Sequence, residues 1–247
     1  MSFIKACGIT REEDALAACA AGFTALGFVF AESPRKVDPE RAKEICDRLP
    51  ASILRVGVFV AEEAEEVERV ARFCGLDLVQ LHGEDTVELA HRFGKRAIPC
   101  LRPRSAGDLE MMDEFGDPFA VLIDTWNPVL AGGTGATGDW KLASLAASRS
   151  RIILAGGLNP RNVREAISIV HPFGVDVSSG VEKQPGLKDA SLLKEFALAA
   201  HGMFCSSPGI ASKPRIRTFA PGGDGRDASG ETRRRKVNDR EKGKDGS

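Results

Sequence analysis

The stretch RIILAGGLNPRNVREAISIVHPFGVDVSSGVE, from Arg151 to Glu182, contains two short apolar segments on either side of a segment with helical spacing. The apolar segments, 151–154 and 175–177, are rich in β-branched residues, as buried strands are. Asn159 and Pro160 are typical of a helix start, because asparagine caps free N–H groups and proline fits the first turn. The stretch therefore predicts a strand–helix–strand unit.

The same unit recurs along the chain. Eight apolar, β-branched segments begin about 24 residues apart, which is the length of one strand, one helix and two loops. We predict strands at 4–7, 25–30, 54–60, 76–81, 97–101, 119–123, 151–154 and 175–177. Eight such units leave a closed barrel or a doubly wound open sheet, and the count favours the barrel. The predicted fold class is α/β, a (β/α)8 TIM barrel.

Helices are predicted between these strands, each covering the sheet with one apolar face. Segments 62–73 and 189–201 show such a face, and a capping box, Thr10-Arg-Glu-Glu13, predicts the start of the first helix.

The repeat ends at His201, where the composition changes. Residues 202–247 hold 11 Lys and Arg against 6 Asp and Glu, whereas residues 1–201 hold 23 against 29, so the net charge of −1 combines an acidic body with a basic end. Little apolar surface remains beyond His201 to offset the entropy of ordering. We predict one barrel domain over 1–201 and a basic, disordered tail over 202–247.

The composition of the 247 residues, 43% hydrophobic and 28% charged, is that of a globular protein. The six cysteines form no CxxC pair, no histidines stand at zinc spacing, and no export signal or 18-residue apolar run is found. These observations predict reduced thiols, no metal, no membrane segment and a cytoplasmic location.

Functional groups of a (β/α)8 barrel cluster where strands end. Cys7 ends the first strand, where its thiol is either a base or nucleophile activated by a nearby cation, or a small buried side chain. Asp124 follows three apolar residues, and partial desolvation suits a carboxyl group there to donate a proton; a helix cap or salt bridge is the alternative. The glycines of 132–135 predict a mobile loop over the site.

Glycines also follow the last two predicted strands. Gly156 and Gly157 follow the seventh strand, and Ser179 and Gly180 follow the eighth. Their backbone N–H groups are unobstructed by side chains, and barrels of this kind bind phosphate at this place. Simple tight turns are the alternative, but two such turns on adjacent strands favour a phosphate site.

Four further polar residues are candidate substrate contacts. Arg35 follows a proline near the barrel mouth and can bind a planar carboxylate with paired donors, or else it is a solvated surface arginine. Gln80 and His82 end the fourth strand, where His82 alternatively hydrogen bonds within the wall. Asp176 alternates with apolar neighbours on the eighth strand, as a site residue or as a satisfied polar core group.

The motifs occur in a fixed order: Lys5-Ala-Cys-Gly8, Gly27-Phe-Val-Phe30, Ser33-Pro-Arg35, Gln80-Leu-His-Gly83, Asp124-Thr125, Gly132-Gly-Thr-Gly135, Ala155-Gly-Gly-Leu158, Ser178-Ser-Gly-Val-Glu182 and Pro185-Gly-Leu-Lys-Asp189. Over residues 3–200 this set closely resembles the phosphoribosylanthranilate isomerase family. The resemblance implies an Amadori rearrangement of N-(5-phosphoribosyl)anthranilate to 1-(2-carboxyphenylamino)-1-deoxyribulose 5-phosphate, the third step of tryptophan biosynthesis, without cofactor or metal.

The resemblance also implies roles for single residues. Asp124 is the general acid that opens the furanose ring, Cys7 is the general base that removes the C2′ proton, and Arg35 holds the anthranilate carboxylate. The glycines and serine after the last two strands match the family's phosphate loops. Lys5, on the same strand face as Cys7, is placed to favour the thiolate. Gly138 stands where the family usually has an aromatic residue, which leaves the packing of that loop open.

Two alternatives differ in class. A metal-dependent sugar-phosphate epimerase would need several histidine and aspartate ligands, and the chain has four histidines; dual-substrate sugar isomerases have an aspartate at the position of Cys7. A polyanion-binding protein would use the basic run Arg233–Lys236, which is short and lacks interleaved aromatic residues. We therefore expect a small phosphorylated substrate, no nucleic acid and a monomer, with a homodimer as the alternative.

Overall fold

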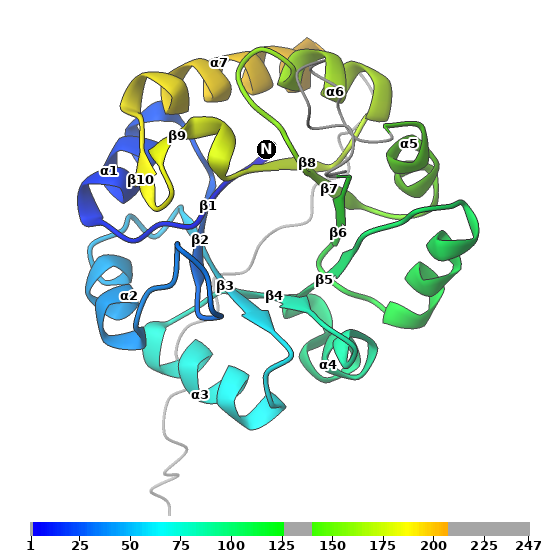
Figure 1. Cartoon of the computed structure of the whole chain (residues 1–247), viewed down its shortest axis with the longest axis horizontal. Helices are drawn as coiled ribbons and strands as arrows, with labels where there is room; N and C mark the ends of the chain where they lie inside the picture. Colours follow the sequence, from blue (N-terminus) through cyan, green and yellow to red (C-terminus); the bar gives the residue numbers. More distant parts are fainter. Residues whose placement is uncertain (1, 126–139, 207–247) are drawn as a thin grey trace, which may run out of the picture. The chain divides into compact units, whose positions relative to one another are not determined.

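The computed structural model describes residues 2–125 and 140–206. Eight parallel strands close into a barrel in chain order, with β1 hydrogen bonded to both β2 and β8 (Figure 1). Their bounds are Phe3–Cys7 (β1), Ala25–Val29 (β2), Leu54–Val60 (β3), Leu78–His82 (β4), Ala97–Leu101 (β5), Val121–Asp124 (β6), Ile152–Ala155 (β7) and Gly174–Val177 (β8). The predicted (β/α)8 barrel is confirmed, and every strand end lies within two residues of its prediction.

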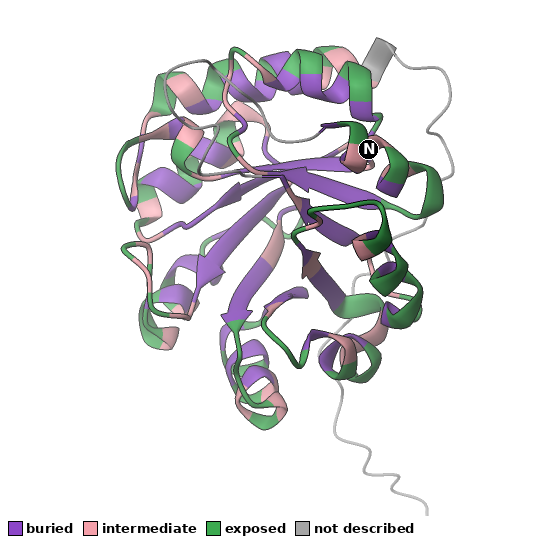
Figure 2. Ribbon diagram, turned by 45° about the vertical axis from the view of Figure 1, so that its right-hand side comes forward, coloured by how far each residue is buried: buried purple, intermediate pink, exposed green. Residues whose placement is uncertain are grey.

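Helices surround the barrel, and their buried faces point to the strands (Figures 1 and 2). They are α1 (Glu12–Ala21), α2 (Pro39–Cys46), α3 (Ala64–Cys74), α4 (Thr86–Phe93), α5 (Trp140–Arg149), α6 (Val163–Val170) and α7 (Ala190–Ser206), with 3-10 segments η1 (Gly94–Arg96), η2 (Gly107–Phe115) and η3 (Ser179–Val181). Between β5 and β6 the segment η2 replaces the expected α-helix. Within the described residues, no helix is both long and apolar enough to cross a membrane.

Side chains fill the barrel in layers. Phe3, Lys5 and Cys7 share one face of β1, because successive side chains of a strand alternate between its faces. Phe3 belongs to an apolar cluster with Ala25, Val56, Leu78, Ile98, Ala120, Leu122, Ile153 and Ala155. Cys7 lies in a separate small cluster with Val29 and Val58. The barrel interior is therefore apolar around Phe3, near the strand starts. It contains the polar groups of Lys5 and Asp176 closer to the strand ends.

A hairpin between β8 and α7 lies next to the start of α1. Its strands are β9 (Glu182–Gln184) and β10 (Leu187–Lys188), which pair antiparallel. The Thr10 hydroxyl donates to the carbonyl of Gly186 at 2.7 Å, and α1 begins at Glu12 without a side-chain cap. The predicted capping box is therefore wrong, because the Thr10 hydroxyl is engaged by the hairpin.

Helix α7 continues to Ser206, five residues beyond the predicted end of the barrel domain at His201. The boundary at His201 was predicted from the change in composition, but Met203 and Phe204 are partly buried against the core within the continued helix. The predicted tail beyond Ser206, the glycine-rich loop at 132–135 and Gly138 lie outside the described residues.

Truncation tests where the barrel domain ends. We expect a chain that ends at His201 to be less stable than one that ends at Ser206, because it exposes the apolar surface that Met203 and Phe204 cover. Partial burial of two such side chains contributes about 1–2 kcal/mol, or roughly 2–4 °C in Tm for each kcal/mol at this size. Thermal unfolding of the two chains side by side measures the difference, and equal Tm values would contradict it.

Candidate active site

Lys5, Cys7 and Asp176 form a buried polar cluster inside the barrel. The Lys5 side chain is fully buried, and its Nζ donates to Asp176 Oδ1 at 3.0 Å. Lys5 and Asp176 are register partners on β1 and β8, so the strand pairing itself brings them together. Lys5 also hydrogen bonds the Cys7 thiol. Asp176 is thus a hydrogen-bonded group of the barrel interior. It pairs with Lys5, which precedes Cys7 by two residues on β1.

The protonation of Cys7 reflects two opposed effects. Burial raises the pKa of the Cys7 thiol, and the positive charge of Lys5 opposes this without overcoming it, so the pKa lies above its ordinary value. Lys5 acts in the expected direction, since its charge and hydrogen bond lower the pKa of Cys7, but desolvation has the larger effect in the free protein.

Lys5 itself stays charged in this interior. Burial alone would lower its pKa, but the Asp176 carboxylate raises it above the ordinary value. Gly27 on β2 leaves the space for this cluster, since a Cβ there would lie 3.0 Å from both Cys7 Sγ and Lys5 Nζ.

Arg35 is held by a glutamate rather than left open at the barrel mouth. Its Nε donates to Glu182 Oε1 at 2.9 Å and its Nη2 to Glu182 Oε2 at 2.7 Å, in a bidentate pair. Gly8, with φ of +79°, passes so close that a Cβ would lie 2.5 Å from Arg35 Cδ. Arg35 is therefore not a freely solvated arginine, and Glu182 occupies its Nε and one N–H of its Nη2.

Gln80 and His82 contact each other inside the wall of β4. Gln80 Nε2 and His82 Nε2 lie 2.8 Å apart, and Gln80 Oε1 is buried without a hydrogen-bond partner among the described residues. Burial, followed by the charges of Arg102 and Lys5, lowers the pKa of His82 to about 4, so its imidazole is neutral at pH 7. The pair offers a neutral ring and an unused amide oxygen.

Asp124 ends β6 on the opposite side of the barrel from β1. Its Oδ2 accepts a hydrogen bond from Arg102 Nε at 2.8 Å, and its side chain is 16% exposed whereas that of Arg102 is 70% exposed. The predicted apolar edge is therefore incomplete, because an arginine that follows β5 pairs with the carboxylate. Of the two alternatives to a proton donor, a helix cap or a salt bridge, the structure contains the salt bridge, between Asp124 and Arg102.

The two sides of the barrel face one interior. The protonation of His82 is influenced by both Asp124 and Lys5, and that of Cys100 by Asp124 and Asp176. Because such Coulomb effects fall off with distance, these charges lie around one space. Burial is the largest cause that raises the pKa of the Cys100 thiol, which fits packing in the interior rather than chemistry.

The loops after β7 and β8 approach each other closely. Gly156 and Gly157 have φ of +93° and +66°, which side chains disfavour, and a Cβ at Gly180 would lie 1.9 Å from the carbonyl oxygen of Leu158. No hydrogen bond between described residues uses the N–H groups of Gly156, Gly157, Ser179 or Gly180. Four such donors on two adjacent loops can bind an anion.

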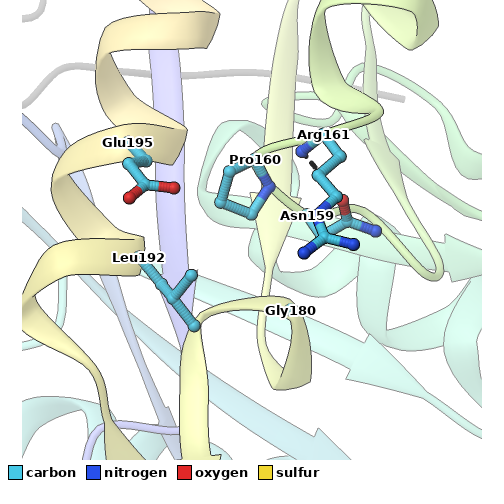
Figure 3. A pocket seen from close by; sticks show the side chains of 6 residues that line it. All are labelled: Asn159, Pro160, Arg161, Gly180, Leu192 and Glu195. Carbon is cyan, nitrogen blue, oxygen red and sulfur yellow. Dashed lines mark hydrogen bonds between the residues drawn. The ribbon is translucent and has the colours of Figure 1, made fainter.

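A pocket of about 310 Å³ lies beside these donors (Figure 3). It lies between α7, which supplies Leu192 and Glu195, and the segment that leads into α6, which supplies Asn159, Pro160 and Arg161. Gly180 is the one predicted phosphate residue that lines it. Glu195 and Arg161, of opposite charge, both line this pocket, so it gives no preference for an anion and the phosphate prediction rests on the loop N–H groups.

Comparison with known proteins identifies the family. A family model described as N-(5'phosphoribosyl)anthranilate (PRA) isomerase matches residues 4–199. The chain belongs to this family. The N-(5'-phosphoribosyl)anthranilate isomerase of Pelobacter propionicus is 50% identical over 194 residues, which cover 78% of this chain and 92% of that relative.

Solved structures of PRA isomerases agree in fold. The phosphoribosyl anthranilate isomerase of Thermotoga maritima has a TM-score of 0.74 and 44% identity, and the match covers 82% of this chain and 100% of that one. A second PRA isomerase structure, in complex with reduced 1-(o-carboxyphenylamino)-1-deoxyribulose 5-phosphate, has a TM-score of 0.72 and 41% identity over the same shares. The sequence resemblance is therefore confirmed.

Three residues of this PRA isomerase family member were not singled out from the sequence as part of the site. Glu182 and Lys188 lie within quoted motifs, but nothing local indicates that they contact Arg35 and Cys7. Arg102 could have been selected from the sequence, because it is the charged residue directly after the predicted strand 97–101. In the described residues, no group of three or more histidine, cysteine or acidic side chains is arranged to hold a metal ion.

Proposed function

We propose that this PRA isomerase works by acid and base catalysis between Asp124 and Cys7, without a cofactor or metal. The isomerisation of N-(5-phosphoribosyl)anthranilate in tryptophan biosynthesis is the activity of its family. The observation that carries the residue assignment is that a thiol and a carboxyl group stand at the carboxyl ends of β1 and β6, two strands of one closed parallel barrel. The anion-binding donors of the last two loops border the same mouth.

The first step opens the sugar. Asp124 donates a proton to the ring oxygen, the C1–O bond breaks, and the lone pair of the anthranilate nitrogen forms a C1=N double bond. A general acid is needed because an alkoxide is a poor leaving group. Arg102 is hydrogen bonded to Asp124 at 2.8 Å and stabilises the carboxylate that remains after transfer.

The second step moves the double bond. The Cys7 thiolate takes the proton from C2, and the C–H electrons form a C1=C2 bond while the C1=N pair returns to nitrogen. The enolamine then gains a proton at C1 and loses one from the C2 hydroxyl, which gives the ketone. Lys5 hydrogen bonds the sulfur and stabilises its negative charge before the proton arrives.

Binding uses the two ends of the substrate. The N–H groups of Gly156, Gly157, Ser179 and Gly180 are proposed to hold the phosphate. Arg35 is proposed to hold the anthranilate carboxylate through Nη1 and the second N–H of Nη2, since Glu182 occupies Nε and one N–H of Nη2. Gln80 Oε1 and the neutral His82 are proposed to contact sugar hydroxyls.

The cellular setting completes the proposal. We infer a cytoplasmic enzyme that acts as a monomer, with a homodimer as the alternative, and that binds a small phosphorylated substrate and no nucleic acid.

Turnover of the fluorescent substrate tests the proposed function. We expect purified full-length protein to consume phosphoribosylanthranilate, with loss of its fluorescence, at an unchanged rate after dialysis against a chelator. A pentulose phosphate serves as the control substrate and should not be converted. Absence of turnover, or a rate that returns only with added metal, would contradict the proposal.

A further inference from the structure

Lys188 carries a buried charge that the steps above do not use. Its side chain is 1% exposed, and Nζ donates to the carbonyl oxygen of Cys7 at 2.5 Å, to Glu182 Oε1 at 2.8 Å and to the carbonyl oxygen of Ser178 at 3.3 Å. An ammonium group has three N–H donors, so each of them has one acceptor. All three N–H groups of the Lys188 ammonium are therefore hydrogen bonded.

The three acceptors belong to three parts of the site. Cys7 contributes the proposed base, Ser178 begins the loop that contains two of the phosphate donors, and Glu182 holds Arg35. Ser178 Oγ also donates to the Cys7 carbonyl at 3.1 Å, so two donors fix that one oxygen. The Lys188 ammonium is thus the point where these three parts meet.

Packing alone does not require a charge at this position. An apolar side chain would fill the same volume without the desolvation that an ammonium group suffers, and burial indeed lowers the pKa of Lys188 despite the opposing charge of Glu182. Hydrogen bonds from Arg35 and Lys188 in turn lower the pKa of Glu182, although burial alone would raise it, so the pair is ionised. The charge therefore serves to bind the three acceptors to each other.

We propose that Lys188 is a positioning residue for the isomerisation, whose ammonium group holds the Cys7 strand end, the phosphate loop and the Glu182–Arg35 pair in one arrangement. This inference rests on the proposed function. It assigns Lys188 no contact with the substrate. Its positive charge near Cys7 adds to that of Lys5 in favouring the thiolate, which gives the role a measurable signature.

The test compares Lys188→Met with Lys183→Met in the full chain. Lys183 lies on β9 of the same hairpin and is exposed, so its substitution removes a charge without touching the site. We expect Lys188→Met to lower kcat/KM roughly 100-fold through both a lower kcat and a higher KM, because small displacements of reacting groups have effects of this size. Lys183→Met should leave both constants unchanged.

A second measurement does not depend on turnover. The rate at which iodoacetamide alkylates Cys7, followed by mass spectrometry as a function of pH, reports the thiolate fraction. We expect its midpoint to move to higher pH in Lys188→Met and to stay in place in Lys183→Met. If the wild-type chain shows no turnover, the proposed function fails, and this profile still decides whether Lys188 acts on Cys7.

Unchanged kinetic constants and an unchanged alkylation profile in folded Lys188→Met would overturn the proposal. So would a loss of activity that equals the loss of folded protein by circular dichroism. If Lys188→Met does not fold, Glu182→Gln keeps the side-chain volume and weakens one of the three links. It should raise KM more than it lowers kcat, and wild-type values in that variant would equally overturn the proposal.

Discussion

Cys7→Ala is expected to reduce kcat by roughly 10²–10⁴-fold, the usual contribution of a general base, while the protein stays folded. The thiol is the one group at the end of β1 proposed to accept the C2 proton, and alanine offers no substitute. The substitution removes a single buried sulfur atom from a residue that is 8% exposed. Its effect on Tm should therefore be small compared with its effect on turnover.

The matched control is Cys46→Ala. Cys46 is also buried, on α2, and lies in the layer between helices and barrel rather than in the interior. It should show a comparable change in Tm and a normal kcat. Near-normal turnover in Cys7→Ala, or an equal loss in both variants, would show that the Cys7 thiol is not the base.

The pH profile provides an independent check on Cys7. Because burial raises the pKa of the Cys7 thiol above its ordinary value, the fraction in the thiolate form increases tenfold per pH unit through the neutral range. We expect kcat/KM, which reports the free enzyme, to rise with pH throughout that range and to level off only in alkaline solution. A plateau already reached at pH 7 would contradict a buried thiol as the base.

The strands could be predicted, and the candidate pair Cys7 and Asp124 could be selected, because their signals are local. Short β-branched segments at a regular spacing indicate a barrel, and its strand ends are known places for chemistry, which was enough to single out Cys7 and Asp124. The glycines after β7 and β8 were found in the same way, since a backbone that approaches a ligand needs them.

The partners of these groups depend on contacts between distant parts of the chain. Lys188 lies 181 residues from Cys7, and Thr10 lies 176 residues from Gly186, so no spacing rule connects them. The spacing of Thr10 and Glu13 predicts a helix cap, but it does not reveal that the Thr10 hydroxyl donates to the distant hairpin instead. The net shift in the pKa of Cys7 could not be predicted for the same reason, because desolvation depends on everything packed around the thiol.

Asp124→Asn is expected to reduce kcat by roughly 10²–10⁴-fold, the usual contribution of a general acid, with little change in the binding of a phosphorylated product analogue. The amide has the same size as the carboxyl group, and its oxygen still accepts the hydrogen bond from Arg102, so the local geometry should persist. It has no acidic proton, so the ring oxygen would leave as an alkoxide.

Asp117→Asn serves as its control, because Asp117 is 79% exposed and pairs only loosely with the exposed Lys95. A second comparison separates acid catalysis from simple charge loss. Arg102→Met should leave more activity than Asp124→Asn, since it removes the partner that stabilises the carboxylate but keeps the proton donor itself. If Arg102→Met lost more activity than Asp124→Asn, the charge of the arginine rather than the proton of Asp124 would be what opens the ring.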